Sequence, residues 1–515
     1  NQSNSQPNTY TSMLDIQKNL SKSFYALLAL PATAMGFALS VQISALSWIL
    51  STQYGLDIKD VGLVWAAGPL AGIIGQVLIG IISDKVWFWD GRRRPFILIG
   101  GVLSALMLLA LPNIGVISGA LGIEAILGVA VTVTLTLDLA INVSFNPTRS
   151  IIADVTPEGR PRTRGYTWMQ TISGTFGVLA YAIGALFGNI VLIYFGVGLV
   201  LLFSLIPPFF IKEPRYLDDA IDADLTPSTA GGANQSAADV SAPVQKDSAL
   251  EILKTIYPLW GFLIYSIYAF LARFGVVHVD YHIMEIGSAI LTVGLILKAL
   301  LSSETGKSRD EAGLVGFQKV LAAHSFTWIG AQTMFIYMFA AVQHRMPQVN
   351  DTELGQIISW SFFALNLVAA IIPAVILEPM AARFGRVKTH MVSIFIMAIG
   401  YTGLFYMGVS PVMIYALMAI VGIGWAATIS LQFAIMSQKI PKSKMGLYMG
   451  LFNLSVVLPQ LVASLGVGEL IDSAPDKGIT FIVCAVTVGL SGLAWSLVKE
   501  PVDHDTTNPV SDGGH

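Results

Sequence analysis

Residues 80–96, GIISDKVWFWDGRRRPF, connect one long apolar segment to the next through a short loop. The loop contains an acidic residue, Asp84, followed by Gly91 and a basic cluster. A second loop of the same kind, LEPMAARFGRVKTH, occupies residues 377–390, where Glu378 precedes a glycine and further basic residues. The recurrence of this loop predicts that the chain consists of two repeated halves.

The composition of the 515-residue chain argues against a soluble enzyme. Apolar residues make up 54% of the sequence and charged residues only 12%, which is about half the charged fraction of a typical soluble domain. A net charge of −3 gives no reason to expect a nucleic acid partner. The single cysteine leaves no internal disulfide framework and no multi-cysteine metal site. We therefore predict an all-α polytopic protein whose main partner is the lipid bilayer.

The apolar runs are long enough to cross a bilayer, which takes about 20 residues per helix. Six of them form an N-terminal half (23–211), at 23–50, 61–83, 95–112, 123–150, 165–188 and 190–211. Two shorter runs, 256–274 and 284–301, form an inserted hairpin (256–301). Six more form a C-terminal half (320–498), at 320–342, 355–377, 390–408, 411–437, 446–468 and 479–498. The prediction is 14 transmembrane helices.

Polar segments separate these parts. We expect residues 1–22 and 499–515 to be cytoplasmic tails, 302–319 to be a cytoplasmic loop, and 212–255 to be a disordered linker rich in Asp, Ala, Ser, Gly and Thr. With the N-terminus in the cytoplasm, all but five of the 29 Lys and Arg residues fall on the cytoplasmic side, the exceptions being Lys59, Arg149, Arg273, Arg345 and Lys477. This strong bias follows the positive-inside rule. It favours a hairpin that spans the membrane over the alternative, two helices lying on its surface.

The GRRRPF loop resembles the signature loop of the major facilitator superfamily. More narrowly, it resembles the sucrose–proton symporters and their relatives in the glycoside-pentoside-hexuronide:cation symporter group. The matching positions are Ser83, Asp84, Gly91 to Phe96, the upstream GPLAG of 68–72, Gln76, and the set Asp138, Asn142, Pro147, Arg149, Ala153 and Asp154. GLYMGLFNLSVVLPQ (446–460) is similar to bacterial members of the group. In the first helix the sequence departs from the family, because Ser40 follows GFAL and Gln42 comes two residues later.

This resemblance implies the major facilitator fold and a symporter in a bacterial plasma membrane, which imports a disaccharide such as maltose, sucrose or a related α-glucoside. It implies no catalysis and no cofactor, with a proton as the coupling ion. It also implies that Asp138 carries the proton and that Arg149 is its electrostatic partner. We expect the protein to be a monomer.

The residues of the fourth helix support the same chemistry. On an α-helix, positions 138, 142, 145 and 149 fall on one face, which we orient toward the cavity. Burial disfavours the charged form of a carboxylate, so we expect Asp138 to take up and release a proton near neutral pH. Arg149 lies about 16 Å further along the helix axis, so a permanent ion pair is not implied. The alternatives are a purely structural Asp138 and an Arg149 that snorkels to the cytoplasmic surface.

Sugar binding needs amide partners for hydroxyl groups and aromatic faces for C–H surfaces. Buried amides are costly without partners, so amides within apolar helices suggest a hydrated cavity. The candidates for substrate binding are Gln42, Gln76, Asn142, Gln332, Trp328 and Trp425. Each of these side chains could instead serve helix packing.

We interpret a set of charged residues at the cytoplasmic ends of the helices as a gate. It consists of Asp84, Arg92, Arg93, Arg94 and Asp154. Contacts among them would hold one conformation closed and break on opening. The alternative is that the arginines serve membrane topology alone.

Other functions fit the sequence less well. Sodium coupling stays open because a carboxylate can bind Na⁺ as well as a proton, and a sugar sensor of the same fold also stays open. His278 and His282 have the spacing of a metal-binding pair on a helix, but no catalytic motif accompanies them, and we expect no metal site.

Overall fold

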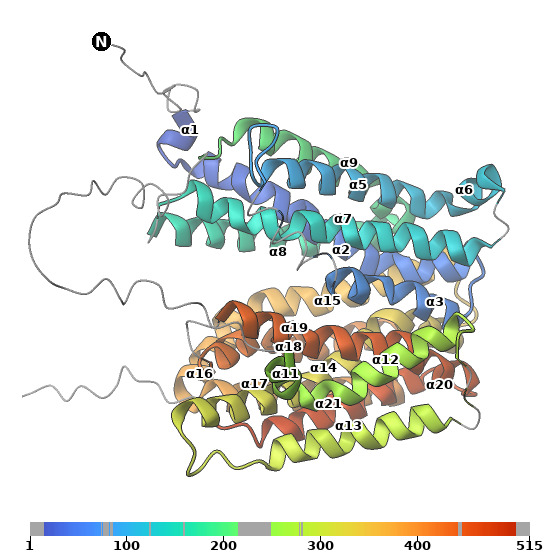
Figure 1. The fold of residues 1–515 in the computed structure, drawn as a ribbon. Coiled ribbons are helices and arrows are strands. Elements are labelled where there is room, and N and C mark those ends of the chain that lie inside the picture. The colour runs from blue at the N-terminus through green and yellow to red at the C-terminus, as the bar shows by residue number, and fades with distance from the viewer. Residues whose placement is uncertain are drawn as a thin grey trace, which may run out of the picture. The chain divides into compact units, whose positions relative to one another are not determined.

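The computed structural model describes residues 15–73, 75, 82, 86–122, 125–157, 160–214, 249–277, 279, 282–440 and 445–500. It divides into two compact units. The first comprises Asn1–Lys254 together with Gln348–Phe363, and the second comprises Thr255–Pro347 together with Ala364–His515. Helices make up all the regular elements of the described residues (Figure 1).

The first unit contains the predicted N-terminal half. In it, α2 packs against α8 and α9, while α5 packs against α7 and α9 (Figure 1). The helices are α1 (Asp15–Lys18), α2 (Lys22–Thr52), α3 (Ile58–Trp65), α5 (Arg94–Ala110), η2 (Leu111–Asn113), α6 (Ile114–Leu121), α7 (Ile126–Val155), α8 (Arg160–Phe187), α9 (Asn189–Phe210) and α11 (Ala249–Thr255), which ends at the boundary between the units.

The second unit contains the inserted hairpin and most of the predicted C-terminal half. In it, α14 packs against α21 and α19, and α17 packs against α18 and α21. The elements are η3 (Tyr257–Leu259), α12 (Trp260–Arg273), α13 (Ile283–Leu301), α14 (Arg309–Arg345), α15 (Asp351–Ile372, whose first part belongs to the first unit), η4 (Pro373–Leu377), α16 (Glu378–Phe384), α17 (Arg386–Met407), α18 (Pro411–Ser437), α19 (Met445–Val462), η6 (Ala463–Val467), α20 (Gly468–Ser473) and α21 (Ile479–Trp495).

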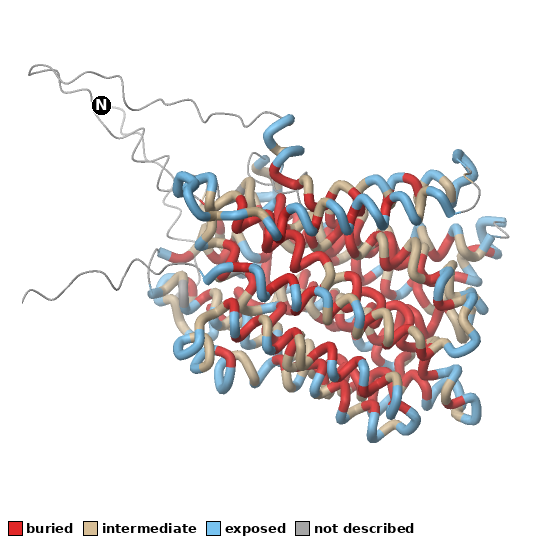
Figure 2. The backbone as a smooth tube through the Cα atoms, turned by 90° about the horizontal axis from the view of Figure 1, so that it is seen from below, coloured by how far each residue is buried: buried red, intermediate tan, exposed pale blue. Residues whose placement is uncertain are grey.

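Eleven helices in the described residues are long and apolar enough to cross a membrane. Large apolar side chains cover their outer faces: Leu106 is 51% exposed, Ile290 68% and Ile399 66%. Figure 2 shows exposed residues along the outer helix faces and buried residues toward the inside. Because water disfavours so much exposed apolar surface, these faces fit contact with lipid.

Several helices differ in extent from the prediction. The predicted cytoplasmic loop 302–319 is too long, because α14 already begins at Arg309. A capping box sets this start: the Ser308 hydroxyl accepts from the N–H of Glu311, and the Glu311 carboxylate accepts from the N–H of Ser308 at 3.1 Å. The predicted linker 212–255 is also too long at its end, because α11 occupies Ala249–Thr255. Residues 215–248 lie outside the described part of the chain.

Two glycines allow α5 to pack closely on both neighbours. A Cβ atom added to Gly100 would lie 2.6 Å from the backbone oxygen of Ala140 on α7. A Cβ atom on Gly101 would lie 2.0 Å from the Cβ of Ser204 on α9. The pair therefore fixes the position of α5 against the helix that carries Asp138.

The hairpin of α12 and α13 lies beside α14 and α19 in the second unit (Figure 1). The hairpin makes a close contact at η6, a π-helical turn in which a Cβ on Gly466 would lie 2.3 Å from the Tyr265 hydroxyl of α12. A second π-helical turn, η4, continues α15. Such turns interrupt the regular helix ladder and are frequent at functional sites.

Candidate functional site

Asp138 lies in the middle of α7, and only 4% of it is exposed. The Nε2 of Gln42, on α2, donates a hydrogen bond of 3.2 Å to its Oδ2 atom. No described cation forms an ion pair with this carboxylate. The sequence placed Gln42 among the sugar-binding candidates, and the structure brings it to the coupling candidate instead.

Small residues leave room around this carboxylate. A Cβ atom on Gly68 would lie 3.4 Å from the Oδ2 of Asp138. Asn142, one turn further along α7, donates from Nδ2 to the Asp138 backbone oxygen at 2.8 Å. A Cβ on Gly75 would lie 2.9 Å from the Cβ of Asn142. The amide of Asn142 is thus turned back onto its own helix. Gln76, the other predicted amide in this half, lies outside the described residues.

Arg149 is exposed near the end of α7 and does not contact Asp138. Its guanidinium lies 4.2 Å above the centre of the Phe145 ring, one turn earlier. The Tyr166 hydroxyl of α8 donates to the Arg149 backbone oxygen at 3.3 Å. The structure therefore places the Arg149 guanidinium against the Phe145 ring, while Asp138 is buried eleven residues earlier on the same helix.

An aromatic and amide cluster occupies the second unit. Trp328 and Trp425 meet edge to face, with ring centres 5.6 Å apart. Trp425 also meets Phe335, at 5.5 Å. Trp328, Gln332 and Phe335 recur on one face of α14, at the spacing of one and two helical turns. Both tryptophans are half-buried, which leaves ring surface for a ligand.

Hydrogen bonds fix the orientation of this cluster. The indole N–H of Trp328 donates to the Nε2 of His324 at 2.7 Å, so the ring proton of a neutral His324 sits on Nδ1. Gln460 on α19 donates from Nε2 to the Oε1 of Gln332 at 3.2 Å. Sequence reasoning did not assign a role to His324, although its spacing of four residues from Trp328 on one helix face was a usable signal.

The structure brings together two of the residues that the sequence analysis assigned to a gate. Arg93 and Asp154 form an ion pair of 3.0 Å, in which the side chains are 8% and 10% exposed. Arg94 donates to the backbone oxygen of Asp90 at 3.0 Å and also to that of Pro208. The backbone N–H of Arg92 donates to a carboxylate that was not among the predicted gate residues. Asp84 lies outside the described residues.

That carboxylate belongs to Glu213, which sequence reasoning missed. It accepts from the backbone N–H groups of Arg92 at 2.9 Å, Arg93 at 2.8 Å and Arg94 at 2.7 Å, and so caps the start of α5. The second unit repeats this arrangement, because Glu500 accepts from the N–H groups of Arg386 and Val387 at the start of α17. Both acids occur in a Lys-Glu-Pro triplet after the sixth helix of a half, at 212–214 and 499–501. The repeated triplet was the sequence signal that could have identified these two capping acids.

A polar seam within the first unit lies at the opposite end from Arg93. The hydroxyls of Ser44 on α2 and Ser359 on α15 are 2.6 Å apart. The Ser359 hydroxyl donates to the Oδ1 of Asn189 at 2.9 Å. The indole N–H of Trp48 donates to the backbone oxygen of Asp351 at 2.7 Å. These contacts join the first part of α15 to α2 and α9, and the sequence did not predict them.

The sequence profile of the Major Facilitator Superfamily matches residues 28–464, and a further match covers 350–514. Sucrose transport protein SUC4 of Arabidopsis thaliana is 24% identical over 492 residues, which cover 88% of this chain and 85% of that protein. The general alpha-glucoside permease of Schizosaccharomyces pombe is 30% identical over 174 residues, or 32% of this chain and 31% of that protein.

Solved transporters share the fold at low identity. The peptide transporter PepTSo has a TM-score of 0.59 at 12% identity, with 92% of this chain and 97% of that chain covered. The inward-open xylose transporter XylE of E. coli has a TM-score of 0.56 at 14% identity, with 93% and 96% covered. The matched family and these relatives are transporters and not enzymes.

Proposed function

This chain belongs to the major facilitator superfamily, and from that premise we propose that it is a proton-coupled symporter that imports a disaccharide by alternating access. The observation that carries the proposal is the buried carboxylate of Asp138, which has an amide partner and no ion pair with a cation of the described residues.

The substrate class rests on the relatives and on the residues of the second unit. The names of the relatives specify sucrose and alpha-glucosides. The edge-to-face tryptophans and the bridged amides of Gln332 and Gln460 offer the aromatic surface and hydrogen-bonding groups that a sugar needs. Maltose, sucrose and related α-glucosides are the substrates to test first.

The coupling rests on the free energy of a buried charge. An ionised carboxylate that is taken out of water without a paired cation is strongly destabilised. A proton removes that penalty, and so does a bound Na⁺. We favour the proton because the partner of the Asp138 carboxylate among the described residues is the Gln42 amide, which donates an N–H. A bound Na⁺ would instead need several oxygen ligands converging on one point. Arg149, anchored on Phe145, is the cation that would approach and withdraw as the transporter changes state.

The hydrophobic pattern supports 14 crossings, with the hairpin of α12 and α13 spanning the membrane. The basic ends of α2, α5 and α8 then face the cytoplasm of a bacterial cell, and the seam around Ser359 faces outward. On this assignment the Arg93–Asp154 pair belongs to the cytoplasmic gate.

The deciding experiment uses proteoliposomes loaded with a pH-sensitive dye. A panel of disaccharides is added outside, and acidification of the lumen is recorded for the wild type, Asp138→Asn and Asp57→Asn. Asp57 caps α3 through its side chain, and Asn caps equally well, so this variant is a matched control. We expect acidification in the wild type and the control, and none in Asp138→Asn.

Exchange of labelled sugar separates coupling from folding. If Asp138→Asn still exchanges sugar at equal concentrations on both sides, the residue couples the proton and does not hold the fold. Acidification by Asp138→Asn at the wild-type rate would contradict the assignment. A folded wild-type protein that translocates none of the sugars would indicate a sugar sensor instead of a transporter.

A further inference from the structure

A groove of about 730 Å³ lies at the basic end of the first unit. It is formed by the turn before α2 and by the first three turns of α8. Its lining includes Arg160, Arg164, Trp168, Tyr25 and Asn19. No acidic side chain lines it among the described residues. The groove therefore carries a positive potential with two guanidinium groups at its wall.

The two arginines are arranged along one line. Arg160, Arg164 and Trp168 recur every four residues on α8, so they share one face over about 12 Å. Arg164 lies 5.9 Å above the centre of the Tyr25 ring, which orients its planar fork. Neither Arg160 nor Arg164 forms an ion pair with a described residue. Arg93, the residue before the start of α5, by contrast forms an ion pair with Asp154.

The position of the groove matches a membrane surface. The arginines begin a helix that is apolar further along, with Trp168 two turns in. Tryptophan prefers the depth at which lipid headgroups meet acyl chains. Basic pockets between membrane helices on the cytoplasmic side bind anionic headgroups. Arg also recognises phosphate through two parallel N–H donors.

We propose that this groove binds the phosphate headgroup of an anionic glycerophospholipid, with Arg160 and Arg164 holding the phosphate and Trp168 packing against the glycerol backbone. The groove of the second unit is the internal contrast. It measures about 770 Å³, but Glu378 and Glu500 line it together with Arg386, so its charge does not favour an anion. The site is independent of the transport reaction and of Asp138.

The test is the melting temperature of the purified full chain in detergent. Phosphatidylglycerol, phosphatidylcholine or inorganic phosphate is titrated into the wild type, into Arg160→Gln/Arg164→Gln, and into Lys307→Gln/Arg383→Gln as a charge-matched control. We expect phosphatidylglycerol to stabilise the wild type and the control, with at least a tenfold higher half-saturating concentration for the groove variant. Phosphatidylcholine and inorganic phosphate should have little effect.

Three results would overturn the proposal. An equal response of the groove variant would place the lipid elsewhere. Equal stabilisation by inorganic phosphate would identify a soluble anion as the ligand.

If the Gln variant does not fold, Arg160→Lys/Arg164→Lys keeps the charge but loses the planar fork, and we expect it to bind several-fold more weakly. Wild-type affinity in that variant would indicate unspecific charge attraction and no built site.

Discussion

Gln42 is the residue whose role changes most between sequence and structure. The sequence marks it as an amide inside an apolar helix, which fits sugar binding and helix packing equally. Its partner, Asp138, is 96 positions away, and no local pattern reveals such a pairing between α2 and α7. Asp138 itself could be predicted, because an acid inside an apolar run stands out by its cost. Arg149 stood out for the same reason, but its contact with the Phe145 ring depends on side-chain geometry, which the sequence does not give.

We predict that Gln42→Ala lowers the rate of sugar-dependent proton uptake by about tenfold or more. A hydrogen bond to a charged group contributes about 1.5–3 kcal/mol, and its loss leaves the Asp138 carboxylate without its donor. The measurement is initial acidification in proteoliposomes as a function of sugar concentration. A fall in the maximal rate supports a role through Asp138, whereas a rise in KM alone would return Gln42 to sugar binding.

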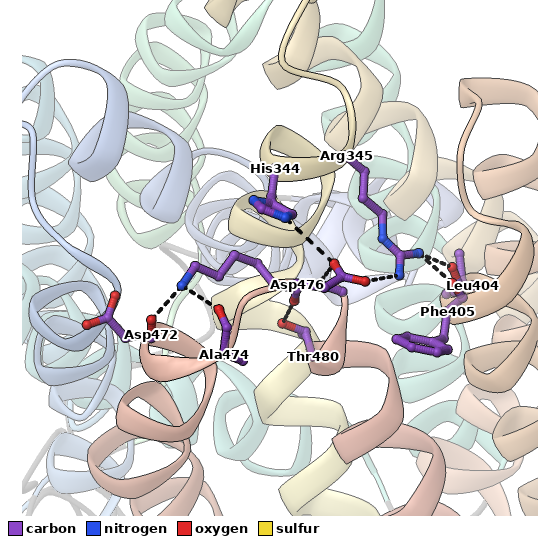
Figure 3. A network of polar contacts seen from close by, with 10 residues as sticks. His344, Arg345, Leu404, Phe405, Asp472, Ala474, Asp476 and Thr480 are labelled. Carbon is purple, nitrogen blue, oxygen red and sulfur yellow. Dashed lines mark hydrogen bonds and ion pairs between the residues drawn. The ribbon is translucent and has the colours of Figure 1, made fainter.

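Asp476 gives a prediction for pH. It lies outside the membrane-spanning segments, between α20 and α21, and accepts a hydrogen bond of 3.0 Å from Arg345 (Figure 3). Arg345 also donates to the backbone oxygens of Leu404 and Phe405. The Arg345 hydrogen bond is the main cause that holds the pKa of Asp476 below its ordinary value of 3.8. A carboxyl with a lowered pKa stabilises the fold above its ordinary pKa and loses that contribution as the pH falls through the folded value.

Asp476→Asn should therefore lower the melting temperature at neutral pH and converge with the wild type as the pH falls below about 3.8. The carboxylate is 49% exposed, so the effect is small, about 0.2–1 kcal/mol. Thermal unfolding in detergent across this pH range is the measurement. A gap that stays constant down to the most acidic pH would show that the ionisation of Asp476 does not stabilise the fold.

At the scale of the helices, the sequence predicts which segments form helices better than it predicts where each helix begins and ends. The apolar runs identified every long helix of the described residues. The start of α14, by contrast, depends on the capping box at Ser308, a local sequence signal that the prediction did not use. The π-helical turns η4 and η6 could not be predicted, because they arise where a helix adapts to its neighbours. Close helix contacts through Gly100 and Gly101 are of the same kind.

We predict that Gly100→Ala lowers the free energy of unfolding by about 1–3 kcal/mol, because the added methyl group would overlap the Ala140 backbone. Gly128→Ala, on α7, is the control, since nothing lies within 4 Å of the added atom. It should leave stability unchanged or raise it slightly. Melting temperatures of both variants check the prediction, and equal values would contradict the close approach of α5 and α7.

The capping acids lead to a second prediction at this scale. Glu213 is 5% exposed and satisfies three backbone N–H groups, whereas Glu500 is exposed and satisfies two. Glu213→Ala should destabilise the protein by about 1–3 kcal/mol, and Glu500→Ala by less. Thermal unfolding of the two variants gives the order. A larger loss for Glu500→Ala would show that burial does not set the strength of these caps.

At the scale of the whole chain, the prediction of two halves rested mainly on repeated sequence features. The paired loops at 80–96 and 377–390 identified the two halves and, with the motifs around them, the superfamily. The unit boundary itself was not predictable, because Gln348–Phe363 joins the first unit through hydrogen bonds of Ser359 and Asp351 that connect distant parts of the sequence. The Lys-Glu-Pro triplets show that a finer repeat was present in the sequence.

The central claim is that a proton bound at Asp138 drives sugar uptake. Its most direct test is accumulation of labelled maltose or sucrose in proteoliposomes under two gradients, an inward proton gradient without sodium and an inward sodium gradient at equal pH. The account predicts accumulation above equilibrium with the proton gradient alone, and its loss in Asp138→Asn. Accumulation driven only by sodium, or retained in Asp138→Asn, would contradict it.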